Sequence, residues 1–142
     1  MLIGRYEHTL DDKGRLTLPA DYAAQIAGGV VLTRGLESCI YLFPQPEFER
    51  LSNRLRELAF TDPKARKLRR QIFPQAHAAV PDRQRRVLIP QWLREHAGIT
   101  DRVLIAGMDN YAEIWSPEAW LQQDQLLAAE LANEDFFAAL GV

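Results

Sequence analysis

Residues 11–19 read DDKGRLTLP, and residues 82–90 read DRQRRVLIP. With the prolines aligned, Asp, Arg, two apolar residues and Pro coincide at an offset of 71. Both stretches are followed by a short segment that runs to Gly28 or Gly98, then by an apolar run, a turn and a second apolar run. The same order of elements over roughly forty residues indicates an internally duplicated chain.

Each copy predicts a β-hairpin, a short helix and a second β-hairpin. In the first copy, residues 6–10 are strand formers, and residues 15–18 alternate between polar and apolar side chains. Residues 12–14 between them have turn composition, since glycine adopts positive φ at little cost. A proline begins each short helix, and Gly28 or Gly98 ends it.

One unit of about 45 residues is too small to bury an adequate core alone. Two units that exchange hairpins would share one core and leave fewer open sheet edges. The expected fold is α+β and mainly β: an internally duplicated, swapped-hairpin β-barrel with a helical insert and a C-terminal helix. Its interior is predicted to contain Leu16, Leu18, Val31, Leu42, Val87, Ile89, Leu104 and Ile114.

Helical segments lie between and after the copies. Residues 47–60 place apolar side chains at helical spacing, and Asp62-Pro63 begins a second helix that Pro74 ends. The run from Pro117 to Leu140 is expected to pack its start on the chain's own core, while its end could meet that core or a neighbouring subunit. The predicted domains are residues 5–51, a helical connector over 52–76, residues 77–120, and a C-terminal helical tail over 121–142.

Composition narrows the class of protein. A hydrophobic content of 47% argues against wholesale disorder. The single cysteine, Cys39, fits a reducing cytoplasm and is predicted to be a buried structural thiol. No apolar run approaches the ~20 residues of a membrane span, and the N-terminus lacks the apolar core of a signal peptide. A soluble, cytoplasmic protein with no membrane partner is expected.

The charge is distributed unevenly. All 17 Lys and Arg lie in residues 1–102, which carry 12 acids and a formal charge of +5, whereas residues 103–142 carry seven acids and no Lys or Arg. This asymmetry leaves open a polyanion partner or simply an acidic terminal helix. The basic cluster over residues 64–70 is interpreted as a solvated helix face that adds diffuse attraction to phosphate.

Signals for catalysis are weak. The three histidines are far apart, and none has metal-ligand spacing to cysteine or carboxylates. The chain contains neither a Gly-Lys-Ser phosphate loop nor a dinucleotide fingerprint. We therefore expect no enzyme, no catalytic or metal-ligating residue and no cofactor.

Basic residues gather instead at the two hairpin loops, here named the first tip (residues 11–15) and the second tip (residues 82–86). The first carries Lys13 and Arg15, and the second carries Arg83, Arg85 and Arg86. A two-stranded β-ribbon fits the DNA major groove, where Arg bonds guanine and Lys meets phosphate. Related by a pseudo-twofold axis, the two tips would share one face and form a DNA-binding surface.

The opening MLIGRYEHTL, followed by DDKGRLTLP, resembles the start of the MraZ family of bacterial transcriptional regulators. The family motif Asp-x-Lys-Gly-Arg matches residues 11–15 without a gap, and the resemblance covers nearly the whole chain. It implies two SpoVT-AbrB-type swapped-hairpin domains, ring-shaped homo-oligomers and association with the nucleoid. It also implies binding to double-stranded DNA at tandem G-rich repeats in the promoter of the division and cell-wall gene cluster, usually as a repressor.

The resemblance also implies roles for the residues of each tip. In the first tip, DNA contact falls to Lys13 and Arg15, and loop shaping falls to Asp11 and Gly14. The first tip is therefore predicted to be the main base-reading element.

The second tip departs from the family pattern. Asp82, a loop-shaping residue, and Arg86 match, whereas Arg85 stands at the glycine position and Gln84 at the position of Lys13. Positive charge is retained without the glycine. The second tip is accordingly expected to act mainly in the fold or on phosphates.

Other functions remain as alternatives. A DNA-binding antitoxin or transition-state regulator of the AbrB type usually has one copy of the module, so the duplication disfavours it. A structural ring without DNA contact would assemble but give no salt-sensitive DNA shift. RNA binding would suit the charge, but no aromatic stacking platform is evident.

Overall fold

Each copy supplies four strands in the predicted order, in a computed structural model that describes residues 1–142. The strands of the first copy are β1 (Arg5–Thr9), β2 (Arg15–Thr17), β3 (Val30–Arg34) and β4 (Ile40–Pro44). Those of the second copy are β5 (His77–Ala79), β6 (Arg86–Leu88), β7 (Arg102–Gly107) and β8 (Ala112–Trp115). The mainly-β α+β fold is confirmed.

The short helix of each copy follows its proline. The first copy has a 3₁₀ turn, η1 (Ala20–Tyr22), that runs into α1 (Ala23–Ile26), and the second has α4 (Gln91–Ala97). Gly98 ends α4 in the left-handed conformation with a φ of 64°, as predicted. In the first copy α1 ends just before Gly28, as predicted, and the glycine with positive φ is the next residue, Gly29, at 113°.

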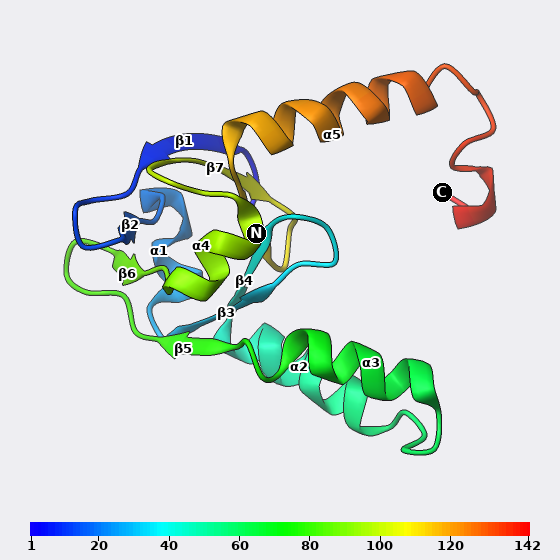
Figure 1. Ribbon diagram of the computed structural model, residues 1–142, viewed down its shortest axis with the longest axis horizontal. Coiled ribbons are helices and arrows are strands. Elements are labelled where there is room, and N and C mark those ends of the chain that lie inside the picture. Colours follow the sequence, from blue (N-terminus) through cyan, green and yellow to red (C-terminus); the bar gives the residue numbers. More distant parts are fainter.

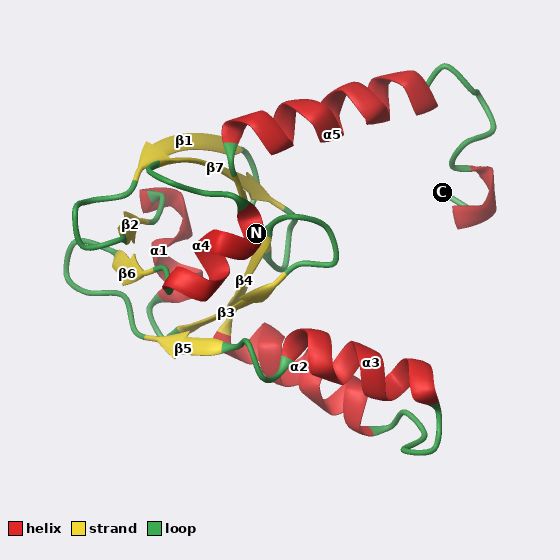
Figure 2. Ribbon diagram, viewed as in Figure 1, coloured by secondary structure: helices red, strands yellow, loops and turns green.

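The copies are interlocked by strand exchange (Figure 2). Six strands form one antiparallel sheet in the order β1-β7-β8-β4-β3-β5, and β2 pairs with β6 in a separate two-stranded ribbon. Strand β1 of the first copy therefore pairs with β7 of the second, and β5 of the second pairs with β3 of the first. Neither copy can complete its sheet alone, which is the arrangement expected of swapped hairpins.

The pairing register reveals a pseudo-twofold axis. It passes through the β2–β6 ribbon where Leu16 lies opposite Val87, and through the β4–β8 pair where Tyr41 lies opposite Glu113. The flanking pairs exchange under this axis, because Arg15 opposes Leu88 just as Thr17 opposes Arg86. The two copies in the sequence are therefore related by a pseudo-twofold axis in the structure.

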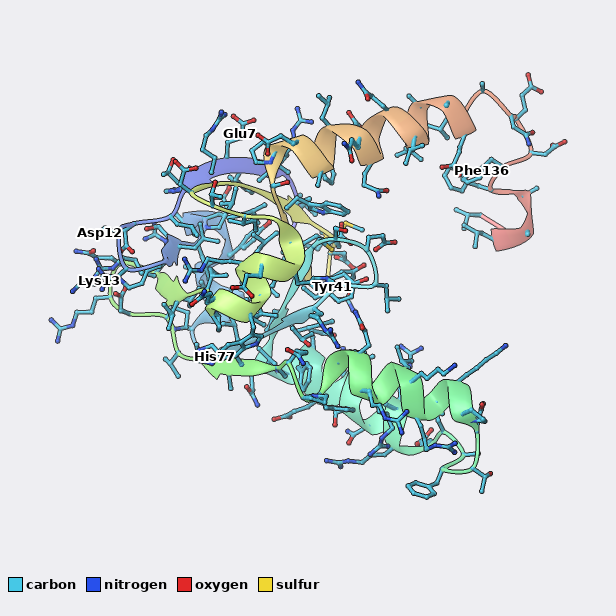
Figure 3. The ribbon with its side chains drawn as sticks, in the orientation of Figure 1. Glu7, Asp12, Lys13, Tyr41, His77 and Phe136 are labelled. Atoms are coloured by element: carbon cyan, nitrogen blue, oxygen red, sulfur yellow. The ribbon has the colours of Figure 1, made fainter.

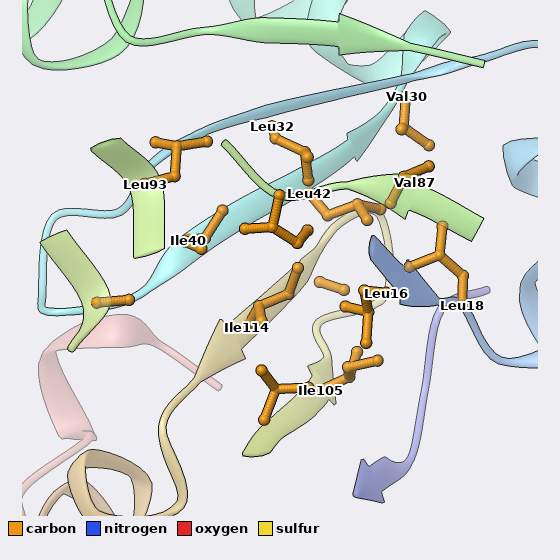
Figure 4. Close-up of a cluster of buried hydrophobic side chains, with 14 of the residues drawn as sticks. Leu16, Leu18, Val30, Leu32, Ile40, Leu42, Val87, Leu93, Ile105 and Ile114 are labelled. Atoms are coloured by element: carbon orange, nitrogen blue, oxygen red, sulfur yellow. The ribbon is translucent and has the colours of Figure 1, made fainter. Parts of the chain in front are cut away.

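The shared core lies between the sheet and the ribbon (Figure 4). Six predicted residues belong to it: Leu16, Leu18, Leu42, Val87, Ile89 and Ile114. Val31 and Leu104 are buried as predicted, but they lie on the opposite faces of β3 and β7, outside the shared core. Strands covered on both faces lose the alternation that would have fixed their register. The residues of these strands that join the core are Val30, Leu32, Val103 and Ile105.

The insert between the copies is a helical hairpin formed by α2 (Gln45–Arg56) and α3 (Pro63–Ile72). Asp62 caps α3 as predicted, since its Oδ1 accepts the Lys64 backbone N–H at 2.9 Å. Helix α2 was expected to reach Phe60 but ends at Arg56. Residues 57–62 instead form the turn that leads into α3. Phe60 is left in that turn, 83% exposed.

The C-terminal helix α5 (Pro117–Glu130) projects from the body as a second arm, away from the α2–α3 hairpin (Figure 1). Ser116 caps it by accepting the Ala119 N–H at 3.1 Å, and Trp120 packs edge-on against Trp115 with ring centroids 6.0 Å apart. No residue of α5 is buried, so only its first turn is anchored on the body, and the predicted helix to Leu140 is broken after Glu130. No helix of the chain combines the length and apolar character that a bilayer span requires.

Candidate nucleic-acid interface

The first tip is built around one carboxylate. Oδ1 of Asp11 accepts the backbone N–H groups of Lys13 at 3.0 Å and Arg15 at 2.8 Å, and Oδ2 accepts Nε–H of Arg15 at 2.7 Å. Gly14 donates its N–H to the Asp11 carbonyl at 3.0 Å and has a φ of 78°, the left-handed region that glycine enters most easily. Asp11 therefore holds both the backbone of the loop and the guanidinium of Arg15.

The second tip repeats this geometry. Oδ1 of Asp82 accepts the N–H groups of Gln84 and Arg86, both at 2.9 Å, and Oδ2 accepts Nε–H of Arg86 at 2.8 Å. Arg85 has a φ of 60° and makes the same N–H bond to the Asp82 carbonyl, at 2.9 Å. The second tip therefore has the same turn as the first, although arginine stands at the glycine position. A left-handed residue with a side chain costs about 1–2 kcal/mol of strain.

Both carboxylates are held in the charged form. The backbone N–H of Arg15 is the main cause that lowers the pKa of Asp11, and that of Arg86 does the same for Asp82. The guanidinium of the same arginine lowers each pKa further. The same kinds of contact therefore favour the ionised aspartate in both tips.

The two tips lie at one end of the molecule (Figure 1), and each is hydrogen-bonded to the other copy. The Leu18 N–H donates to the Arg85 carbonyl at 2.8 Å, and the Ile89 N–H donates to the Gly14 carbonyl at 2.9 Å. These bonds extend the β2–β6 ribbon, so each tip is tied to the strand end of the other copy. The structure brings together all eight tip residues predicted from the sequence: Asp11, Lys13, Gly14, Arg15, Asp82, Arg83, Arg85 and Arg86.

The positively charged side chains of the tips differ in their exposure and in the hydrogen bonds that they make within the chain. Lys13 is exposed, its side chain points away from the body (Figure 3), and its ammonium has no hydrogen-bond partner in the chain. Arg83 is also exposed. Arg15 and Arg86 use only Nε on their aspartates, which leaves both terminal nitrogens for another acceptor. Arg85 is half-buried and donates from Nε to the Leu18 carbonyl at 3.1 Å.

Arg94, on α4, is a further cation at the first tip that sequence reasoning missed. Its guanidinium carbon lies 3.3 Å from the position that a Cβ on Gly14 would occupy. Arg94 thus occupies the space that a side chain at Gly14 would need. Arg94 Nε is buried without a partner. The one available signal was the glycine itself, since an absent side chain often admits a neighbour.

The remaining polar candidates lie elsewhere. The basic cluster over residues 64–70 is on α3, in the arm that projects away from the tips (Figure 1). Cys39 is fully buried, and burial raises the pKa of its thiol. It shares a small cluster with Glu37 and Glu113, in which the ligand atoms all lie within 4.8 Å of one another. Sequence reasoning missed that cluster, because Glu37 and Cys39 lie in the loop before β4 whereas Glu113 comes from β8 of the other copy.

Comparisons with known proteins agree with the duplicated architecture. The family model described as "MraZ protein, putative antitoxin-like" matches twice, over residues 1–71 and 72–140. The chain is 43% identical over 130 residues to a protein of Thermomicrobium roseum, with 92% of each chain covered. It is 45% identical over 120 residues to one of Herpetosiphon aurantiacus, with 84% of each covered. It is 43% identical over 138 residues to one of Roseiflexus castenholzii, with 97% of this chain and 94% of the relative covered. All three relatives are named transcriptional regulator MraZ, and the chain belongs to the MraZ family.

Proposed function

We propose that this protein is a sequence-specific, DNA-binding transcriptional regulator that contacts double-stranded DNA through its two tips. The observation that carries the proposal is the β2–β6 ribbon, which presents two aspartate-pinned loops with Lys13, Arg15, Arg83 and Arg86 at one end of the molecule. A β-ribbon of this width fits the major groove, and guanidinium groups there recognise guanine N7 and O6. The names of the relatives support the same role.

Membership of the family extends the proposal to a target and an assembly. The protein would act in the cytoplasm at the nucleoid, as a ring-shaped homo-oligomer. It would repress the division and cell-wall gene cluster by binding tandem G-rich repeats in its promoter. A single ribbon makes few contacts, so it should bind weakly and with strong salt dependence. Several ribbons on linked subunits would convert weak contacts to adjacent repeats into avidity.

Lys13 offers the sharpest test, because its side chain supports nothing within the protein. We expect Lys13→Ala to lower affinity for the upstream region of the protein's own gene by about tenfold and to reduce the salt slope by about one. Arg15→Ala should in addition lose sequence preference, since a bidentate contact to guanine is worth about 1–3 kcal/mol. Gel shifts and DNase footprints at fixed salt measure both effects.

The matched control is Lys67→Ala, which removes one exposed charge from the distant α3 arm. It should leave the footprint intact. Unchanged promoter binding by both tip variants would overturn the assignment of the tips. An assembled wild-type protein with no salt-sensitive shift would instead favour a structural ring without direct DNA contact.

A further inference from the structure

The α2–α3 hairpin ends in a surface that is both basic and apolar, here named the hairpin tip. Leu58 and Phe60 in its turn are 43% and 83% exposed. They line a shallow depression together with four arginines and no acid: Arg56, Arg66, Arg69 and Arg70. An exposed aromatic side chain ringed by guanidinium groups is typical of an interface anchor, because Phe and Arg are enriched at interfaces.

A cleft of about 440 Å³ beneath α5 has the opposite charge and is here named the α5 cleft. Its apolar lining comes from β8, α5 and the segment after α5, and includes Trp115, Trp120, Leu127 and Phe136. Its charged lining consists of four acids and no Lys or Arg: Glu37, Glu113, Asp124 and Glu130. The cleft is therefore suited to an apolar group that carries positive charge.

The floor of the α5 cleft is electrostatically unfavourable in the isolated chain. Carboxylate oxygens of Glu37 and Glu113 lie within 4.8 Å of each other. Burial raises the pKa of Glu113, and the charge of Glu37 raises it further, although a hydrogen bond from Trp115 lowers it in part. A guanidinium brought into the cleft would relieve this repulsion.

Helix α5 itself is left without support. It runs for 14 residues with none buried, and Leu121, Leu126 and Leu127 are 41–56% exposed. A helix of this length is marginal in water without tertiary packing. Contact with another surface would supply that packing.

We propose that the hairpin tip of one copy of this chain inserts into the α5 cleft of a second copy. This inference rests on the ring assembly of the proposed function and names its contact. Phe60 would enter between Trp120, Leu127 and Phe136, and the arginines would face the acids of the cleft. The hairpin tip ends one arm, and the α5 cleft lies where the other arm, α5, leaves the body. The two arms diverge (Figure 1), so one copy can insert its hairpin tip into a second copy while its own cleft accepts the tip of a third.

Such an interface is heterologous, since it joins two different surfaces, and a closed ring results where the rotation between copies closes. Both arms project from the end of the molecule opposite the DNA-binding tips (Figure 1). Assembly would therefore leave the β2–β6 ribbon of every copy free for DNA.

Charge reversal tests the contact. Arg66→Glu with Arg70→Glu alters the hairpin tip, and Asp124→Lys with Glu130→Lys alters the α5 cleft. Each pair should weaken self-association by about a hundredfold, because close charge pairs at interfaces are strongly coupled. Sedimentation velocity should then show wild-type assemblies but single chains of 16.2 kDa for either pair. A chain with all four substitutions should assemble again.

Two controls each reverse a single charge outside the contact, Lys67→Glu on α3 and Glu134→Lys after α5, and neither should dissociate the protein. Circular dichroism verifies that each variant is folded. A monomeric wild-type protein, or variants that stay assembled, would overturn the inference. So would an Arg66→Glu, Arg70→Glu variant that loses only DNA affinity, which would mark the hairpin tip as a phosphate-binding surface. Because every variant retains both DNA-binding tips, failure of the interface is distinct from failure of DNA binding by the wild type.

Discussion

Two features of the first tip require glycine at Gly14: a positive φ and a neighbouring guanidinium. Its φ of 78° is strained for a residue with a side chain, and a Cβ there would lie 3.3 Å from the guanidinium carbon of Arg94. Gly14→Ala should therefore lower the free energy of unfolding by about 1–2 kcal/mol, the cost of a left-handed alanine. Urea denaturation at neutral pH measures the change.

Gly28→Ala is the matched control for this substitution. Nothing lies within 4 Å of a Cβ at Gly28, and its φ is outside the left-handed region. The substitution should leave stability unchanged or raise it by about 0.4–1 kcal/mol, because alanine has less freedom in the unfolded chain. Equal losses at Gly14 and Gly28 would show that the tip conformation imposes no special demand.

The sequence predicted the tips at the level of single residues, and the reason is local. Asp11 bonds groups two and four residues away, and Asp82 does the same, so the information lies within five residues of chain. Arg94 was missed because its contact with Gly14 spans 80 residues and leaves no local pattern. The strain accepted at Arg85 was also hidden, since glycine was the residue expected for that conformation.

At the scale of elements, both tip loops depend on an ionised aspartate. The folded state lowers the pKa of Asp11 and Asp82, so their stabilisation is complete above the usual aspartate pKa and is lost as pH falls through the lowered values. The free energy of unfolding should therefore fall below about pH 4. Urea titrations between neutral and acid pH measure it.

Replacing both aspartates by asparagine should remove this acid-dependent part. The Asp11→Asn, Asp82→Asn protein should be less stable than wild type at neutral pH and should lose less stability on acidification. Asp12→Asn removes an exposed carboxylate that accepts no hydrogen bond, and it should keep the wild-type profile. An acid profile unchanged by the double substitution would show that the loops do not require the charge.

Helices whose ends are marked by proline, glycine or a capping aspartate were predicted well. Features that depend on packing between distant parts of the chain were not. The prolines and Gly98 marked both short helices, and Asp62 marked the start of α3. Val31 and Leu104 were assigned to the wrong face because continuous apolar runs have no period of two. For α5 the sequence predicted only that its start packs on the body, and its exposed leucines left open what the remainder contacts.

At the scale of the whole molecule, the exchange of strands predicts that half of the chain cannot fold alone. Residues 1–74 would lack β7, the partner of β1, and β6, the partner of β2. This fragment should gain β-structure only as it associates, either with itself or with residues 75–142. Circular dichroism combined with sedimentation measures both quantities, and a folded, monomeric half would contradict the interlocked architecture.

Arg85 stands where the first tip has Gly14, so the two halves of the β2–β6 ribbon present different side chains. A two-fold symmetric reader matches an inverted repeat, because rotation presents the same side chains to both halves of the site. Here rotation exchanges Gly14 and Lys13 for Arg85 and Gln84, so the two orientations on a duplex are not equivalent. Under the proposed function, each bound chain would point one way along the DNA. Its natural operators would then be direct repeats rather than palindromes, and inverting one repeat should cost as much affinity as removing it.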